Sequence, residues 1–374
     1  MADPIRFVEV KQKGALLPLA ALVGEIRRGL EALVSQEQVE TEVLACYRLP
    51  DELTRGTPED PWDLSPTEIS ILKAKFMATA ECVPLGMAFD LDQGVTPGGG
   101  ALGVFLTKFH DNLEPEVTVP AAEAEDLVSW KLGPAKKWLI YPYANDGTPL
   151  NLGKLEFDLD AERARHLVES LIATGSIDYP KTARYLVRHY SLLASREAEK
   201  RQWQELGKRW YEYHRPRDGS KLRRAPKILT RRMTHNFEFS LDEQGVIPTD
   251  SCIAITSKQG SEWGRQLNDL GMTGAEGFVF ATSLLNSSLA KLLIRFSADA
   301  WKGDFYQVRE DILSRIPLKM PTQENLQKFL DVIKAGTNVI TAKHDSAVAD
   351  RAIFRLYGVD NDWEPTVRLL RWID

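Results

Sequence analysis

The sequence predicts an α+β protein with a β-rich centre and helical segments on either side of it. Between residues 82 and 157 of the 374-residue chain, short β-type runs such as ALGVFLTKF and KKWLIYPY alternate with turns. Before this stretch, apolar residues recur at helical spacing from Leu19 to Leu33. After it, the region from residue 321 contains the helical patterns LQKFLDVI and AVADRAIFRLYGV.

The N-terminal elements are predicted from apolar periodicity and from one helix-start signal. Residues 4–12 alternate like a short strand, which precedes the helix predicted by the spacing of the leucines. Residues 49–66 are rich in Pro, Asp and Glu, as is typical of a linker. Ser65 is then a candidate N-cap with Pro66 at the first helical position, so we expect a helix over residues 66–78.

The second half of the chain mixes helices and strands. An amphipathic helix over residues 159–174 is expected to end at Gly175, and a second helix to begin near Pro180 and extend, with a break, to about Tyr213. The remaining expected elements are strands at 226–230, 236–241 and 251–256, a strand or turn leading into a helix at 276–298, and a short strand from Ile312 to Leu318.

Composition excludes several classes of protein. No apolar run approaches the roughly 18 residues that a membrane-spanning helix needs. The N-terminal run MADPIRFVEVKQKG lacks the apolar core of a signal peptide. Cys46, Cys82 and Cys252 form no CxxC pair, which argues against a disulfide framework and against a cysteine zinc site. We therefore expect a cytoplasmic protein with no membrane partner.

Signatures of catalysis are absent or incomplete in this sequence. It contains no Walker A, HExxH or GxSxG motif. Glu9-Val10-Lys11 resembles the ExK half of a metal-dependent nuclease core, but such a site needs a second acidic residue from an upstream strand, and strand-edge charge is the better interpretation. Gly98-Gly99-Gly100 lacks the Lys-Ser/Thr of a phosphate loop and is interpreted as a tight turn. We therefore expect neither a metal site nor catalytic activity of this chain alone.

Charge is distributed very unevenly along the chain. The net charge of −6 would argue against a nucleic-acid partner. However, residues 181–232 contain 16 Lys and Arg against 5 Asp and Glu, a net of +11, whereas the remainder contains 31 against 48, a net of −17. Basic residues neutralise phosphates. We call residues 181–232 the basic block, and it predicts a nucleic-acid-binding surface.

Aromatic residues are interleaved with this charge and could stack on bases. A solvated helix whose aromatic residues face the core is the alternative interpretation, and we favour the core for Trp210. That alternative does not explain why basic residues cluster again beyond the helix at Arg215, Arg217, Arg231 and Arg232. The aromatic residues are Tyr185, Tyr190, Trp203, Trp210, Tyr211 and Tyr213.

Several segments, taken in order, carry a family resemblance. They include LGMAFDLDQGVTPGGGALGVFL from Leu85, KKWLIYPYAND from Lys136, and the block from Tyr179 through WYEYHRPRD to APKILTRR. FVFATSLLNSSLAKLLIRF, ILSRIPL and RAIFRLYGV follow. Their order resembles the C-terminal target-recognition region of TaqI-like adenine-N6 DNA methyltransferases and of fused restriction–modification enzymes.

The resemblance implies three parts in the chain and a function in DNA recognition. An N-terminal helical connector would occupy residues 1–78, a β-rich target-recognition domain 79–320, and a C-terminal helical segment 321–374. The chain would recognise a specific sequence in double-stranded DNA as the specificity subunit or domain of an adenine-N6 DNA methyltransferase, or of a restriction–modification or phage-defence system.

The catalytic motifs of that family are missing from this sequence. It has neither the glycine motif that binds S-adenosylmethionine nor the Asn-Pro-Pro-Tyr motif, and it contains no Pro-Pro pair. S-adenosylmethionine is therefore expected on the catalytic domain of a methyltransferase or restriction partner. Two alternatives stay open. The chain could be a truncated part of a methyltransferase or of a nuclease using Glu9 and Lys11, or a single-strand or RNA-binding module.

The candidate DNA contacts fall into three groups. Helical residues of the basic block are candidates for phosphate contacts. Residues at the helix exit and in the next strand are candidates for contacts in a groove, since arginine pairs bidentately with guanine. The glycine turn is a candidate DNA-facing loop, since glycine permits close approach of the backbone. In that order they are Arg188, Lys200, Arg201, Lys208 and Arg209; Arg215, Arg217, Lys227, Arg231 and Arg232; and Gln93 and Thr96 beside Gly98–Gly100.

Overall fold

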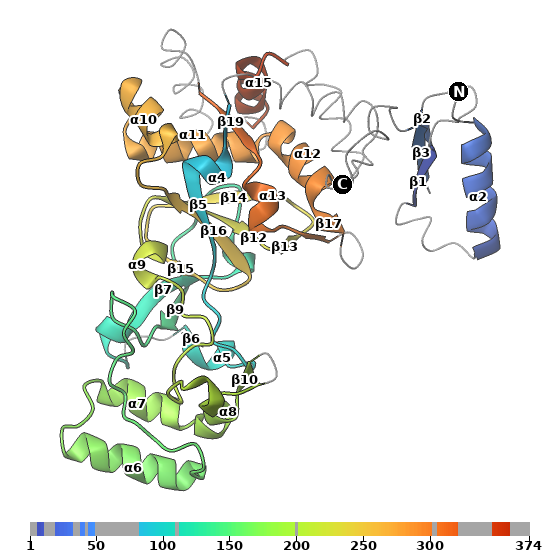
Figure 1. Ribbon diagram of the computed structural model, residues 1–374. Helices are drawn as coiled ribbons and strands as arrows, with labels where there is room; N and C mark the ends of the chain where they lie inside the picture. The colour runs from blue at the N-terminus through green and yellow to red at the C-terminus, as the bar shows by residue number, and fades with distance from the viewer. Residues whose placement is uncertain are drawn as a thin grey trace.

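The computed structural model confirms the α+β class (Figure 1). Among the described residues from Cys82 onward, helices α10 (Glu262–Asp269), α11 (Gly274–Asn286), α12 (Ser288–Ser297), α13 (Glu310–Leu313) and α15 (Ser346–Leu356) gather at one end (Figure 1). Helices α6 (Ala161–Ala173), α7 (Pro180–Val187) and α8 (Tyr190–Ala194) lie at the other end. The residues that the structure describes are 6–10, 19–32, 38–41, 44–48, 82–108, 112–198, 201–300, 305–320 and 346–359.

A five-stranded sheet lies between two apolar clusters. Its order is β5-β16-β12-β14-β8, and all neighbours are antiparallel except β14 and β8. Successive side chains of a strand point to opposite faces, so Ile228 of β12 joins one cluster and Leu229 the other. The strands are β5 (Phe89–Gln93), β8 (Trp130–Lys131), β12 (Lys227–Arg231), β14 (Phe239–Asp242) and β16 (Cys252–Ser257).

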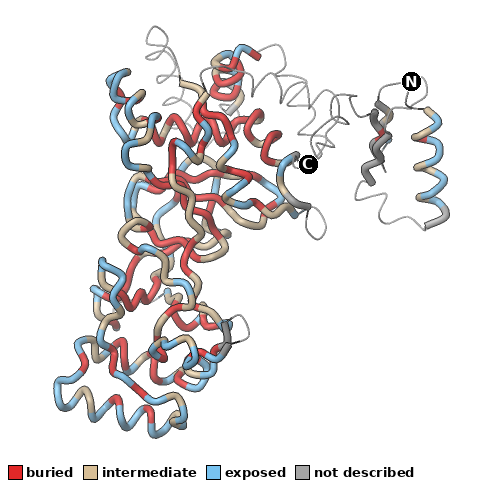
Figure 2. The backbone as a smooth tube through the Cα atoms, viewed as in Figure 1, coloured by how far each residue is buried: buried red, intermediate tan, exposed pale blue. Residues whose placement is uncertain are grey.

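The first cluster packs helices against one face of this sheet, and its interior is buried throughout (Figure 2). Among the described residues no single helix is long and apolar enough to cross a membrane. The bent pair α11 and α12 reaches that length and apolar character only when the two helices are taken together. The surrounding elements are α4 (Leu85–Ala88), α10 (Glu262–Asp269), α11 (Gly274–Asn286), α12 (Ser288–Ser297), α13 (Glu310–Leu313), α15 (Ser346–Leu356), β4 (Cys82–Pro84) and β19 (Pro317–Lys319).

The second cluster lies under the other face, around a four-stranded sheet of order β15-β7-β9-β6. Figure 2 shows helix α6 at its far end with a mostly exposed outer face. Its elements are β6 (Leu106–Thr107), β7 (Thr118–Ala122), β9 (Lys137–Ile140), β15 (Ile247–Pro248), α5 (Leu102–Phe105), α6 (Ala161–Ala173), α7 (Pro180–Val187), α8 (Tyr190–Ala194) and α9 (Gly219–Leu222).

Smaller elements complete the described chain. The N-terminal part holds a helix together with a three-stranded sheet, so it is not purely helical, although the predicted domain boundaries stay predictions. Its elements are β1 (Arg6–Val10), α2 (Leu19–Ala32), β2 (Gln38–Glu40) and β3 (Leu44–Arg48). The others are β10 (Glu197–Ala198), β11 (Arg201–Gln202), β13 (Met233–Thr234), β17 (Asp299–Ala300), β18 (Tyr306–Gln307) and the 3-10 helices Pro115–Val117, Ala124–Asp126 and Gln204–Leu206.

The helix predicted over residues 159–174 is confirmed as α6. Asp160 caps it by accepting hydrogen bonds from the backbone N–H groups of Glu162 and Arg163, and Gly175 follows with φ +70°. The strands predicted near 226–230, 236–241 and 251–256 are confirmed as β12, β14 and β16.

Three predicted elements differ from the structure. The helix expected to reach Tyr213 is interrupted between α7 and α8 and already ends at Ala194; Arg196, two residues later, is buried. Residues 276–298 lie in two helices, α11 and α12, and Ile312–Leu318 is a helical turn followed by β19. The predicted linker at 49–66 and the helix at 66–78 lie outside the described residues.

The Leu-Asn-Ser run at the end of α11 joins helices to the central sheet. Buried Asn286 accepts a hydrogen bond from the Phe239 N–H (3.1 Å) and donates to the Phe239 carbonyl (2.7 Å). Ser287 caps α12, and Asp350 on α15 accepts from both the N–H and the hydroxyl of Ser288 (2.7 and 2.6 Å). The Leu-Asn-Ser run therefore has a structural role: it connects α11 and α12 to strand β14 and to helix α15.

Two other motifs of the resemblance contact each other. The hydroxyl of Tyr357, in the Leu-Tyr-Gly run where α15 ends, donates to the carbonyl of Pro317 (2.8 Å) in the Ile-Pro run. The same hydroxyl accepts from the N–H of Lys319 (3.0 Å). The closing helix is thus attached to β19 by a buried tyrosine.

We expect Asn286→Ala to lower the free energy of unfolding by about 2 kcal/mol or more, because both backbone groups of Phe239 lose a buried partner. Urea unfolding measures the change. Asn236→Ala is the matched control, since Asn236 is exposed and its contacts with Thr234 use its backbone. Equal stability of the two variants would contradict the structural role of Asn286.

Candidate nucleic-acid interface

Five of the twelve predicted contact residues come together around Asp250, in the turn between β15 and β16. The side-chain amide of Gln93 donates to the backbone carbonyl of Asp250 (3.2 Å), and Arg232 donates from Nη1 to the same carbonyl (3.2 Å). Arg217 donates from Nη2 to the Oε1 of Gln93 (3.0 Å). We call Gln93, Thr96, Arg215, Arg217, Arg232 and Asp250 the Asp250 cluster.

Thr96 and Arg215 connect the two loops of this cluster. Their backbones form an antiparallel bridge, with N–H to carbonyl distances of 3.0 Å in both directions. The side chain of Thr96 also hydrogen bonds to Asp250. Arg215 is exposed beside this bridge. The loop after β5 and the loop before α9 are therefore held in register.

Tyr141 fixes the backbone that carries Arg217. Its hydroxyl donates to the carbonyls of Pro216 (3.0 Å) and Arg217 (3.3 Å). Burial raises the pKa of Tyr141 to about 12, so the hydroxyl keeps its proton at neutral pH. Arg217 has φ +58°, a left-handed conformation that costs roughly 1–2 kcal/mol for a residue with a side chain. The rings of Tyr143 and Tyr213 pack against Tyr141 with centroids 5.1 and 5.8 Å away.

The glycine turn is confirmed, and the crowding that requires glycine comes from inside the protein. Gly98 and Gly99 have φ +85° and +56°. A Cβ on Gly98 would lie 2.9 Å from the Cβ of His214, and one on Gly99 would lie 2.6 Å from the Cγ of Arg196. The turn therefore packs on the protein through these two positions.

Arg196 is a buried residue that the sequence did not single out. Its guanidinium donates from Nε to the Leu193 carbonyl (2.9 Å), from Nη1 to Pro97 (2.9 Å) and from Nη2 to Trp210 (2.7 Å). It also lies 4.0 Å from the centroid of the Trp203 ring. Burial lowers its pKa to about 10, which leaves it charged at neutral pH. In a stretch rich in Lys and Arg, nothing in the neighbouring sequence distinguishes a buried arginine such as Arg196 from an arginine on the surface.

Lys227 was predicted as a DNA contact, and this is wrong. Its side chain is fully buried and forms an ion pair with the equally buried Asp242. Asp242 in turn accepts from the N–H groups of Val246 (2.9 Å) and Gln244 (2.8 Å). Burial lowers the pKa of Lys227. The pair anchors the turn after β14 and is inaccessible to a ligand.

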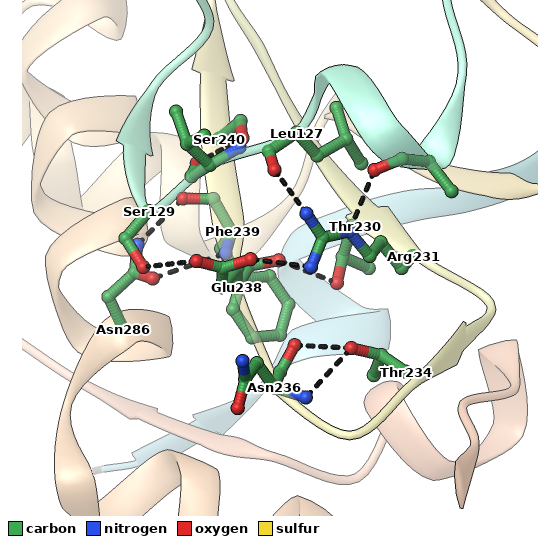
Figure 3. Close-up of polar contacts among 12 residues, drawn as sticks. Leu127, Ser129, Thr230, Arg231, Thr234, Asn236, Glu238, Phe239, Ser240 and Asn286 are labelled. Atoms are coloured by element: carbon green, nitrogen blue, oxygen red, sulfur yellow. Dashed lines mark hydrogen bonds and ion pairs between the residues drawn. The ribbon is translucent and has the colours of Figure 1, made fainter. Parts of the chain in front are cut away.

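Arg231 also has a structural role (Figure 3). It donates to the carbonyls of Ala124 (2.7 Å) and Leu127 (2.5 Å) and to the carboxylate of Glu238 (2.6 Å). Glu238 further accepts from the hydroxyl of Ser129 (3.5 Å), as Figure 3 shows. These contacts attach the segment before β8 to the central sheet, and they occupy three guanidinium nitrogens that the prediction assigned to DNA.

The other predicted contacts lie on loops and helix ends of the second cluster, not along one helix. Arg188 is exposed at the end of α7. Lys208 donates to the Tyr213 carbonyl (2.6 Å), and exposed Arg209 donates to the hydroxyl of Tyr211 (2.8 Å). Lys200 lies outside the described residues, and of Arg201 only the backbone, in β11, is described.

The aromatic residues of the basic block are mostly core residues. Tyr190, Trp203, Trp210, Tyr211 and Tyr213 are at most 1% exposed. The expectation that Trp210 belongs to the core is confirmed, and its indole N–H donates to the Gly153 carbonyl (3.0 Å). Of the two interpretations of these rings, packing in the core therefore holds, and stacking on bases is excluded for these five because they are enclosed.

The structure adds nothing to the nuclease alternative. Glu9 lies in β1 opposite Ala45, and Lys11 lies outside the described residues. Within the described part of the chain, no group of three or more His, Cys, Asp or Glu side chains is arranged to hold a metal ion.

No protein-family model matches the chain. It is 24% identical over 268 residues to the type II methyltransferase M.XhoI of Xanthomonas vasicola. This chain resembles part of a type II methyltransferase. The match covers 71% of the chain and 40% of the relative, so the chain spans less than half of that protein.

A solved structure also resembles the chain. The type IIL restriction–modification enzyme MmeI in complex with DNA superposes with a TM-score of 0.46 and 11% identity. The superposition covers 77% of this chain and 35% of MmeI. The sequence relation to a methyltransferase, predicted from the ordered motifs, is thus found as a distant and partial similarity.

We expect Lys227→Met to lower the free energy of unfolding by about 3–5 kcal/mol, because it leaves the Asp242 carboxylate buried without its counter-ion. Urea unfolding measures this loss. Lys136→Met, at an exposed position, is the control and should change stability by no more than about 0.5 kcal/mol. A Lys227→Met protein as stable as the control would contradict the structural assignment.

Asp250 predicts a pH dependence of stability. Burial raises the pKa of its carboxyl, opposed by Arg232 and by the hydrogen bond from Thr96. Because the folded pKa exceeds the unfolded one, the ionised carboxylate disfavours folding above the folded pKa, and the penalty disappears as the pH falls toward the unfolded pKa. We expect Asp250→Asn to be more stable than wild type at neutral pH, with a difference that shrinks on acidification. A pH-independent difference in urea unfolding would contradict this.

Proposed function

We propose that this chain recognises a specific sequence in double-stranded DNA for an adenine-N6 methyltransferase or a restriction–modification system. The observation that carries the proposal is its similarity to 40% of a type II methyltransferase, in a sequence without the S-adenosylmethionine glycine motif or the Asn-Pro-Pro-Tyr motif. A separate catalytic domain would bind S-adenosylmethionine and transfer the methyl group. The partner would therefore be a methyltransferase or restriction subunit.

The Asp250 cluster supports this proposal by its chemistry. A recognition module needs phosphate contacts to set its register and base-edge contacts to specify sequence. Exposed Arg215 is suited to a phosphate, whereas Gln93 and Arg217 offer donors beside the acceptor groups of Asp250. Such a mixture of donors and acceptors matches the edges of base pairs in the major groove.

Binding of the full chain to a labelled duplex and to its single strands tests the proposal. We expect preference for the duplex, because five of the six aromatic side chains of the basic block are buried and cannot serve as stacking platforms. Equal affinity for single strands would support the single-strand or RNA-binding alternative. Binding of S-adenosylmethionine by the purified chain would overturn the assignment of this cofactor to a partner.

Arg215→Ala should weaken duplex binding and reduce the slope of log K against log salt by about 0.9, the value for one lost phosphate contact. Fluorescence anisotropy across a salt series measures the slope. Arg184→Ala removes the same charge from α7, where Arg184 pairs with Glu169, and should leave the slope nearly unchanged. Identical slopes for wild type and Arg215→Ala would remove Arg215 from the phosphate contacts.

A further inference from the structure

The arginines of this fold differ in how many of their donors the protein uses. A guanidinium has five N–H donors. Arg196 and Arg231 each donate from Nε, Nη1 and Nη2 to protein acceptors. Among the described residues Arg217 donates only from Nη2, to Gln93. Its Nε is buried without a hydrogen-bond partner, so the donors that remain for a ligand are those of Nη1 and the second N–H of Nη2. Arg217 is thus a positioned arginine with donors left for a ligand.

Its backbone is held before any ligand binds. The left-handed conformation of Arg217, at φ +58°, is stabilised by the Tyr141 hydroxyl, which bonds to the carbonyls of Pro216 and Arg217. The Cβ that Gly219 lacks would lie 2.6 Å from the Tyr141 hydroxyl oxygen, so the loop packs closely on this ring. Strained conformations of this kind persist where the surrounding structure imposes them, often at binding sites.

Gln93 sets the direction of the guanidinium. Its Nε2 donates to the Asp250 carbonyl, which leaves Oε1 facing Arg217. One edge of the guanidinium is therefore fixed by an amide that is itself fixed by the backbone. A planar fork held in this way suits an acceptor pair of defined geometry.

The groups beside the Arg217 guanidinium, the Gln93 amide and the Asp250 residue, suit a base edge as that acceptor pair, although the cluster as a whole holds three arginines and one aspartate. The Asp250 carboxyl belongs to the same cluster, and a carboxylate repels a phosphate group. Guanine offers two neighbouring acceptors, O6 and N7, without a net charge. Arg215 lies two residues before Arg217 in the chain and is exposed, so it is the better candidate for a phosphate contact.

We infer that Arg217 reads a guanine through O6 and N7 in the major groove, with Gln93 as its positioning residue. The inference rests on the proposed function and names the base contact of that site.

Selection of duplexes from a library with a randomised core tests this assignment on the full chain. Wild type should select a consensus that contains a G·C pair. Arg217→Asn keeps a residue type that tolerates the left-handed conformation and should lose the preference for guanine at one position, by about tenfold or more. The other positions of the consensus should be unchanged. Arg215→Ala is the matched control and should weaken all sequences alike with the consensus intact.

Gln93→Ala provides a second and independent measurement. It should relax the same base pair as Arg217→Asn, and the double variant should be no more relaxed than Arg217→Asn alone, because both act on one contact. A loss of structure would instead weaken binding to every sequence equally. If Arg217→Asn fails to fold, as judged by its thermal melting, Gln93→Ala decides the question.

The outcomes separate the inference from the function on which it rests. An unchanged consensus for Arg217→Asn, or for Gln93→Ala if the former is unfolded, would overturn the reading of guanine while recognition of duplex DNA stands. Uniform weakening by Arg217→Asn with a smaller salt slope would make Arg217 a phosphate contact and overturn the inference. A wild-type protein that binds duplexes without any consensus would overturn the proposed function itself.

Discussion

The buried guanidinium of Arg196 is the contact on which the candidate interface depends. It joins the end of α8, the turn at Pro97 and the segment at Trp210 through three hydrogen bonds. Burying a charge is unfavourable unless its donors are satisfied, so these segments are constrained to meet. The first loop of the Asp250 cluster runs into the Pro97 turn, and the second follows Trp210. One side chain that touches no proposed ligand therefore sets the spacing of both loops.

The net charge of the basic block does not describe the charge that the block presents at the protein surface. Its net charge of +11 includes Lys227, paired in the interior, and Arg196 and Arg231, whose donors serve the fold. Its aromatic residues enclose the same interior. Other basic residues of the block lie at the surface, among them exposed Arg215 on the loop that also carries Arg217. The arrangement combines an exposed cation with a fixed one, which suits backbone contact and base contact respectively.

The motifs that carry the family resemblance are largely structural. Asn286 joins α11 to β14, and Tyr357 joins α15 to β19. Such contacts preserve a scaffold whatever sequence is recognised, whereas function lies in the groups placed upon it. This agrees with a chain that matches part of a methyltransferase distantly while its proposed base contact lies in a strained loop.

The sequence by itself determined the fold class, helix α6 and strands β12, β14 and β16, because apolar periodicity and caps such as Asp160 act over a few residues. It also indicated Gln93, Thr96, Arg215, Arg217 and Arg232, but not that they meet. Only the tertiary structure decided the end of the helix at Ala194, the burial of Lys227 and the direction of Arg217. Those outcomes depend on partners far along the chain: Arg196 bonds to Pro97 and Arg217 to Gln93. No local pattern contains such pairs.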